Sequence, residues 1–225
     1  MKTTIRFLFL IFIGFLILSN HLNAQDNPVQ RQKWETKIQR YERLDSITPP
    51  QKDVILFVGS SSIENWKSIE SDFPDKPIVS RGVSGTKTVD IYEYRDRLIS
   101  PYQAKQIFIY VGDNDIGYNW KPEEILEQFK KLFFAIRAEK PETEIVFISI
   151  KPFPKRAHRL GSTIETNKLI KDFLEQEENT AYADVYNAMI NERGELNPEH
   201  YQKDGRHLTT DGYKIWREII LKFIK

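Results

Sequence analysis

Four short segments of this sequence set small polar residues beside glycine, and such segments can carry chemistry when the fold brings them together. They are Gly59-Ser60-Ser61-Ser62, Gly82-Val83-Ser84-Gly85, Gly112-Asp113-Asn114-Asp115 and Asp204-Gly205-Arg206-His207. Taken singly, each has an ordinary structural interpretation. Serine after glycine often caps a helix, glycine makes turns, and a histidine before a helix is most often structural.

Together, the four segments contain every group that acyl transfer requires. A serine hydroxyl becomes an effective nucleophile when a histidine takes its proton, and a carboxylate keeps that histidine in the right tautomer. Asp204 stands three residues before His207, a spacing that lets the carboxylate fold back onto one ring nitrogen and leaves the other for a serine. Backbone N–H groups and an asparagine amide can bind the oxyanion.

The elements that must position these groups alternate along the chain. Apolar runs predict strands at residues 54–58, 77–79, 106–111, 144–150 and 180–185. Strands that alternate with helices form a parallel sheet covered on both faces, and ligands bind outside the carboxyl ends of such strands. Each of the first three glycine-containing segments comes after one of the first three predicted strands.

Helical patterns separate the predicted strands. Residues 31–44 have amphipathic spacing that Thr48-Pro49-Pro50 ends, and Ser162 with Glu165 predicts a capping box at the start of a later helix. Two further apolar stripes at helical period are Ile125, Phe129, Leu132, Phe133 and Ile136, and, in the last helix, Trp216, Ile219, Ile220 and Phe223.

These blocks, in this order, resemble the SGNH hydrolases, also called GDSL-type esterases and lipases, from about Asp53 to the C-terminus. The resemblance implies a three-layer α/β/α sandwich with a flavodoxin-like parallel sheet of about five strands, and no metal or other cofactor. It also implies the site residues: Ser61 as nucleophile, Asp204 and His207 as its activating pair, and Ser61, Gly85 and Asn114 as the oxyanion hole.

One residue departs from the family pattern. The first block usually has Asp where this chain has Ser60, and because that Asp has none of the core chemical roles, we expect activity to survive. Ser60 and Ser62 are the alternative nucleophiles. Tyr118 and Trp120, which follow the Asn114 block, could line a sugar or acyl site by stacking or could cap the core.

Composition narrows the class of protein. With 225 residues the chain is long enough to bury a sizeable core. Its formal net charge is only +1, so it lacks the basic surface that binds nucleic acid. It contains no cysteine, which excludes disulfides, thiolate metal sites and cysteine catalysis.

The N-terminus has the layout of a signal peptide. Lys2 and Arg6 precede an apolar run at 7–18, and small and polar residues lead to Ala24-Gln25. We therefore expect residues 1–24 to be a signal peptide, 25–52 a linker and helix, and 53–225 the catalytic domain. An uncleaved N-terminal anchor is the alternative. A lipoprotein is excluded because no cysteine can carry the lipid.

These inferences predict a secreted or periplasmic serine esterase that acts on carboxylic esters of small molecules or polysaccharides, with short acyl (acetyl) groups on carbohydrate as the expected substrate. We expect no nucleic-acid partner and no stable membrane span after signal cleavage. The alternatives are a lysophospholipase or short-chain lipid esterase or thioesterase and, from another class, a non-catalytic glycan-binding module on the same fold.

Overall fold

The computed structural model describes residues 27–225, so the predicted signal peptide lies outside the described residues. The chain divides into two compact units, Met1–Arg40 and Tyr41–Lys225. The described part of the first unit is the beginning of α2 (Pro28–Ile47), where the Asn27 side chain accepts hydrogen bonds from Val29 N and Gln30 N. The helix ends directly before Thr48-Pro49-Pro50, as the sequence predicts.

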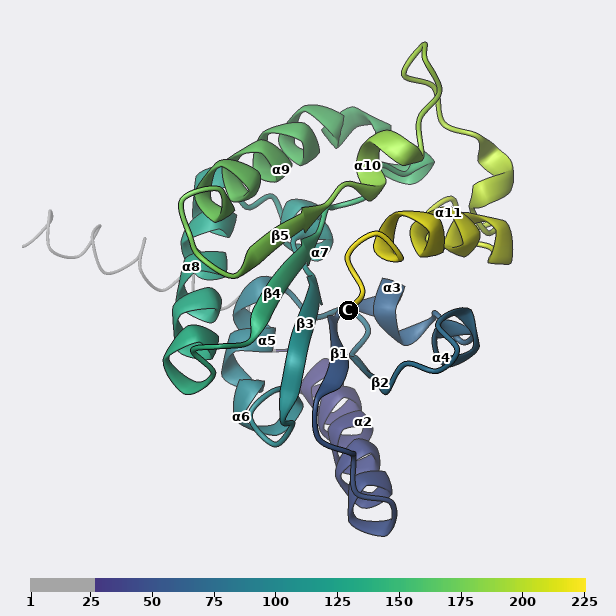
Figure 1. Ribbon diagram of the computed structural model, residues 1–225. Helices are drawn as coiled ribbons and strands as arrows, with labels where there is room; N and C mark the ends of the chain where they lie inside the picture. Colours follow the sequence, from purple (N-terminus) through teal and green to yellow (C-terminus); the bar gives the residue numbers. More distant parts are fainter. Residues whose placement is uncertain (1–26) are drawn as a thin grey trace, which may run out of the picture. The chain divides into compact units, whose positions relative to one another are not determined.

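The second unit is built on a five-stranded sheet in which every pair of neighbours is parallel, in the order β2-β1-β3-β4-β5 (Figure 1). The strands are β1 (Val54–Gly59), β2 (Ile78–Gly82), β3 (Ala104–Tyr110), β4 (Glu144–Ile148) and β5 (Thr180–Ala183). This is the flavodoxin-like order, so the predicted fold class is confirmed.

Helices cover both faces of the sheet. The helices of this unit are α3 (Ser61–Glu64), α4 (Ile69–Asp72), α5 (Thr88–Glu93), α6 (Arg95–Leu98), α7 (Asp113–Gly117), α8 (Pro122–Glu139), α9 (Leu160–Leu174), α10 (Val185–Ala188) and α11 (Thr210–Ile220), with 3-10 turns at Pro154–Arg159 and Pro198–His200. In Figure 1, α5, α6, α8 and α9 lie on one side of the sheet and α3, α4 and α11 on the other. None of the described helices is long and apolar enough to cross a membrane.

Aromatic side chains fill the two layers between sheet and helices. On the α11 side, Phe57 stacks on Phe108 at 4.6 Å between ring centroids, and Trp66 meets Trp216 edge-on at 5.9 Å. On the α8 side, the Phe147 ring lies 5.1 Å from that of Phe129. All six residues are buried, because alternate residues of a strand face opposite layers and both layers are covered.

Two helix predictions need correction. The predicted capping box is wrong: α9 begins at Leu160, directly after a 3-10 turn, so Ser162 lies inside its first turn, and the Ser162 carbonyl accepts a hydrogen bond from Thr166 Oγ1 at 2.7 Å. The predicted last helix is shorter than its apolar stripe, because α11 ends at Ile220 and Phe223 follows in a turn.

The strand order locates the ligand crevice. After β1 the chain moves to β2 on one side and then returns to β3 on the other, so the switch point lies between the carboxyl ends of β1 and β3. Gly59 ends β1 at this point, and a Cβ there would lie 2.1 Å from the Tyr110 carbonyl oxygen. Only glycine allows the two strand ends to approach so closely. Ser61 and Asn114 follow these two ends.

Candidate active site

A serine, a histidine and an aspartate meet at the carboxyl end of the sheet. Ser61 is the first residue of α3 and is 4% exposed. The Nε2 atom of His207 lies 3.0 Å from Ser61 Oγ, and its Nδ1 atom lies 2.6 Å from Asp204 Oδ2. The tautomer that satisfies both contacts has its hydrogen on Nδ1, which donates a hydrogen bond to the Asp204 carboxylate, and it leaves Nε2 to accept the Ser61 O–H.

The segment between the 3-10 turn at Pro198–His200 and α11 fixes the carboxylate of this trio. Asp204 Oδ1 accepts hydrogen bonds from His207 N at 3.0 Å and Arg206 N at 2.9 Å. Desolvation alone would raise the pKa of Asp204, but these backbone bonds and the His207 ring outweigh it and lower the pKa to about 2. Asp204 is therefore ionised at any pH at which such a site would work.

The two neighbouring serines make other contacts. Ser60 Oγ donates to Asp113 Oδ1 at 3.1 Å, and Ser62 Oγ accepts from Lys151 Nζ at 3.0 Å. Ser60 and Ser62 are both buried, and each of their hydroxyls faces the protein interior. Of the three consecutive serines, Ser61 is the one whose hydroxyl lies against the imidazole.

The second and third glycine-containing segments lie against each other beside this trio. Asn114 Nδ2 donates to the Thr86 carbonyl at 2.9 Å, and Asn114 is 3% exposed. The turn before Thr86 is fixed by Ser84 N, which donates to Glu64 Oε2 at 2.6 Å. Gly85, at the apex of that turn, has a φ of +83°, a conformation that favours glycine.

A buried charged group, Lys151, lies below the three serines. Lys151 is 1% exposed, and its Nζ donates to Ser62 Oγ and Tyr110 Oη and lies 3.8 Å from Asp113 Oδ2. Burial lowers the pKa of Lys151 to about 8, although the Asp113 carboxylate opposes this shift. The position of Lys151 just after β4 was the available signal, since polar residues at strand ends gather at the site.

A second buried carboxylate joins α7 to α5. Asp115 is completely buried and accepts a hydrogen bond from Thr88 N, at 3.0 Å to Oδ1 and 3.2 Å to Oδ2. Desolvation raises the pKa of Asp115 to about 7, against the lowering effect of the Thr88 bonds. This contact fixes the residue next to Asn114 against the start of α5.

The two aromatic candidates have different surroundings. Tyr118 is 59% exposed, so it does not cap the core, whereas Trp120 is half-buried. The ammonium of Lys87, a residue only 5% exposed, lies 5.3 Å from the Tyr118 ring centroid and 5.7 Å from that of Trp120. These cation–π contacts hold the two rings beside the segment that contains Gly85.

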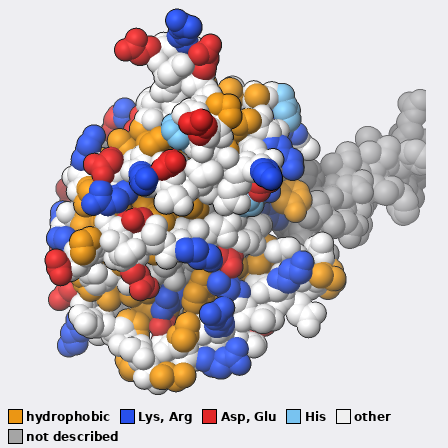
Figure 2. All heavy atoms as spheres, turned by 90° about the vertical axis from the view of Figure 1, so that its right-hand side faces the viewer, with side chains coloured by type: hydrophobic (Ala, Val, Ile, Leu, Met, Phe, Trp, Pro, Cys, Tyr) orange, Lys and Arg blue, Asp and Glu red, His pale blue; other side chains and the backbone are white. Residues whose placement is uncertain are grey.

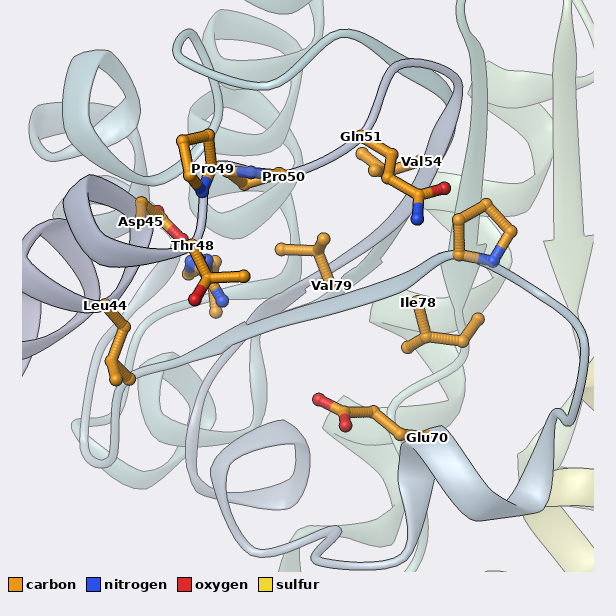
Figure 3. Close-up of a pocket in the computed structure, with 12 residues that line it drawn as sticks. Leu44, Asp45, Thr48, Pro49, Pro50, Gln51, Val54, Glu70, Ile78 and Val79 are labelled. Carbon is orange, nitrogen blue, oxygen red and sulfur yellow. The ribbon is translucent and has the colours of Figure 1, made fainter.

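A separate pocket opens at the other end of the strands (Figure 3). Its wall includes the first residues of two strands, Val54 and Ile78, together with Asp45, Pro49 and Glu70. Because the trio lies at the carboxyl ends, this pocket is not part of the same site.

The rest of the described surface offers few other candidates. Figure 2 shows acidic and basic side chains interspersed on the face that carries α3, α4 and α11. Within residues 27–225, no group of three or more His, Asp and Glu side chains is arranged to hold a metal ion.

A flavodoxin-like sheet with a serine, a histidine and an aspartate in contact at its carboxyl end is the architecture of a class of serine hydrolases. The family follows from the sequence. Residues 45–215 match the model of the GDSL-like Lipase/Acylhydrolase family, and the chain belongs to that family. The protein is therefore a carboxylic ester hydrolase. No curated protein matches the sequence significantly.

Solved structures agree with this fold. A protein from Streptococcus pneumoniae provisionally described as a platelet activating factor is 23% identical, with a TM-score of 0.77 over 95% of this chain and 99% of that one. A GDSL-like lipase from Bacteroides thetaiotaomicron is 20% identical, with a TM-score of 0.69 over 83% and 96%. An acetyl-xylooligosaccharide esterase from Geobacillus stearothermophilus is 15% identical, with a TM-score of 0.64 over 76% and 93%.

Proposed function

We propose that this acylhydrolase is a secreted serine esterase that removes short acyl groups, acetyl above all, from carbohydrate. Ser61 is the nucleophile, His207 its general base, and Asp204 the group that orients the imidazole. The observation that carries the proposal is the position of the His207 ring, with one nitrogen 3.0 Å from Ser61 Oγ and the other 2.6 Å from the Asp204 carboxylate.

The chemistry proceeds in two half-reactions. Ser61 Oγ attacks the ester carbonyl carbon while His207 Nε2 takes the hydroxyl proton, and the carbonyl oxygen becomes an oxyanion. When the tetrahedral intermediate collapses, the C–O bond to the alcohol breaks and His207 gives its proton to the leaving oxygen. A water molecule then repeats the sequence on the acyl-serine, which releases the acid and restores Ser61.

The oxyanion requires donors that are already in place when the charge develops. In this proposal they are the N–H of Ser61, the N–H of Gly85 and the side-chain amide of Asn114. The hydrogen bond from Asn114 to the Thr86 carbonyl supports this role, because it links the amide to the turn that carries Gly85.

Carbohydrate as the alcohol part of the ester rests on the aromatic residues at the site. Tyr118 presents an exposed ring whose position Lys87 fixes, and such a ring can stack on the apolar face of a sugar. The similar fold of an acetyl-xylooligosaccharide esterase supports the same substrate class by analogy. A lysophospholipase, or a short-chain lipid esterase or thioesterase, is the alternative.

The test is release of acetate from a panel of acetylated polysaccharides by wild type and by Ser61→Ala. We expect Ser61→Ala to fold normally and to lose activity by about 10⁴-fold or more. A fluorophosphonate probe should label Ser61, as located by mass spectrometry of peptides, and should not label the variant. Wild-type hydrolysis by Ser61→Ala would show that the mechanism is wrong.

The acyl group and the alcohol are tested separately. A series of nitrophenyl esters from acetate to long chains should show a sharp preference for acetate, and a preference for long chains would favour the lipid-acting alternative. Tyr118→Ala should raise KM for an acetylated polysaccharide and leave nitrophenyl acetate hydrolysis nearly unchanged, because only the polysaccharide has a sugar to stack on the ring.

A further inference from the structure

One cation reaches the proposed oxyanion hole from the loop that carries the base. Arg206 lies between Asp204 and His207 in the sequence, and its side chain extends to α7, where Nη2 donates to Asn114 Oδ1. The other end of the same carboxamide, Nδ2, donates to the Thr86 carbonyl at 2.9 Å.

We infer that Arg206 is a positioning residue for acyl transfer, which sets the orientation of the Asn114 amide in the oxyanion hole. This inference rests on the proposed function. A guanidinium has only donors, so it can face the amide oxygen but not the NH₂ group, and the Asn114 amide cannot rotate by 180°. One N–H of Nδ2 then binds the Thr86 carbonyl, and the second is left for an oxyanion.

The charge of Arg206 also strengthens the donor. A hydrogen bond from a cation is stronger than one between neutral groups, and it polarises the group that accepts it. The Asn114 N–H bonds therefore become better donors to a negative oxygen.

The surroundings of Arg206 argue against a purely structural role. Burial is the main cause that lowers the pKa of Lys151. The charges of Arg206 and Arg156 lower it further, so the three cations repel one another, and the Asp113 and Asp204 carboxylates oppose this effect. The Nε atom of Arg206 is buried and has no hydrogen-bond partner among the described residues. The side-chain hydrogen bond of the Arg206 guanidinium is to the neutral Asn114 amide, whereas a carboxylate is the partner expected of an arginine placed for stability alone.

The same four-residue turn thus supplies both halves of the site. The backbone N–H groups of Arg206 and His207 hold Asp204, while the Arg206 side chain holds Asn114. Base and oxyanion hole are in this way aligned by one short segment.

The test is a double-mutant cycle on Arg206 and Asn114, measured with a fluorogenic acetate ester so that low rates are accessible. We expect Arg206→Met to lower kcat by about 10- to 100-fold with little change in KM, because an interaction that acts in the transition state is weakened. Arg206→Lys, which keeps the charge but not the planar fork, should recover part of that loss. In the Asn114→Ala background, Arg206→Met should have almost no further effect.

Arg159 provides the matched control. Its guanidinium donates to the Ile116 carbonyl at 2.9 Å, on the same short helix, without contacting Asn114. Arg159→Met removes an equal charge and should leave kcat within about twofold of wild type. If Arg206→Met does not fold, Arg206→Gln, which keeps a neutral donor, takes its place in the cycle.

The outcomes separate this inference from the proposed function. Equal losses from Arg206→Met in the wild-type and Asn114→Ala backgrounds, or a change confined to KM, would overturn the positioning role. Full activity of Asn114→Ala alone would instead overturn the proposed oxyanion hole.

Discussion

At the scale of single residues, the departure of Ser60 from the family pattern has a structural explanation. The position is completely buried, and the Ser60 hydroxyl donates to Asp113 Oδ1 at 3.1 Å. The other oxygen of Asp113 lies 3.8 Å from the ammonium of Lys151. In this protein the buried carboxylate is therefore supplied by Asp113 of the third segment, and the cation opposite it is supplied by Lys151, which follows β4.

Restoring the family residue should accordingly harm this protein. Ser60→Asp would set a second carboxylate against Asp113 at a completely buried position, and like charges at that distance cannot both ionise cheaply. We expect Ser60→Asp to be about 1–3 kcal/mol less stable than Ser60→Asn, which has the same shape without the charge. Urea unfolding at pH 8 measures the difference.

The pH dependence of that difference identifies its cause. The paired carboxyls should share a proton, so one pKa is raised in the folded state, and the penalty of Ser60→Asp should shrink as the pH falls towards 5. If Ser60→Asp and Ser60→Asn unfold at the same urea concentration at pH 8, the two carboxylates do not interact as the contact implies.

The roles of Lys151 and Arg206 show where residue-level prediction stops. Lys151 follows a predicted strand, and Arg206 lies within the segment that contains Asp204 and His207. Their partners, Ser62 and Asn114, are nevertheless 89 and 92 positions away in the sequence. Spacing predicts a contact such as that between Asp204 and His207, which lie three residues apart. It carries no information on which buried hydroxyl or amide a long side chain reaches across the sheet.

At the scale of secondary structure elements, the sequence predicts most strands well. β1, β3 and β4 each contain a continuous apolar run that is buried on both faces, whereas β5 is mostly half-buried. The exception is β2, which extends to Gly82 through two polar residues, Ser80 and Arg81. Arg81 can occupy a strand because its guanidinium binds Asp45 from the end of α2 and Tyr102 from the start of the β3 region. Those partners were not recognisable from local sequence.

The contact between α7 and α5 gives an element-level prediction. Asp115 of α7 is buried against the start of α5, and its folded pKa is raised to about 7. Between pH 4 and pH 7 the folded state therefore binds more protons than the unfolded state. The stability that this carboxyl contributes is thus present at low pH and lost as the pH rises through about 7.

Asp115→Asn should remove that pH dependence. Relative to wild type, the free energy of unfolding of the variant should rise with pH across the window from 4 to 7, by at most about 1.4 kcal/mol per pH unit, and level off above it. Urea unfolding at five pH values from 4.5 to 8.5 measures the slope. Parallel curves for the two proteins would contradict the raised pKa.

Asp211 offers a control of opposite sign. Its exposed carboxylate accepts from Lys214 at 2.7 Å, and this bond lowers its pKa. The contribution of Asp211 is therefore present at neutral pH and lost as the pH falls. Asp211→Asn should change the pH slope in the direction opposite to Asp115→Asn, and only slightly, because solvent screens the pair.

At the scale of the whole molecule, every proposed site residue belongs to the second unit, from Ser61 to His207. None of the residues proposed for the chemistry lies in the predicted signal peptide, residues 1–24. The sequence of that segment fits export: two basic residues, an apolar run at 7–18 and a small residue, Ala24. A helix of that run would be about 18 Å long, well short of the roughly 30 Å hydrocarbon core of a bilayer.

Expression of the full chain in an exporting bacterial host tests whether residues 1–24 direct export and are then removed. We expect active enzyme in the periplasm or the medium that begins at Gln25, as measured by intact mass and N-terminal sequencing. Phe12→Arg, which places a charge in the apolar run, should leave a full-length chain in the cytoplasm, because a charge in the apolar core blocks insertion into the membrane.

A chain that starts at Gln25 and is expressed without export should have the same kcat as the secreted enzyme, since it keeps the whole site. Recovery of the uncleaved chain in the membrane fraction would instead identify residues 1–24 as an anchor, and the enzyme would then act on esters at the membrane surface.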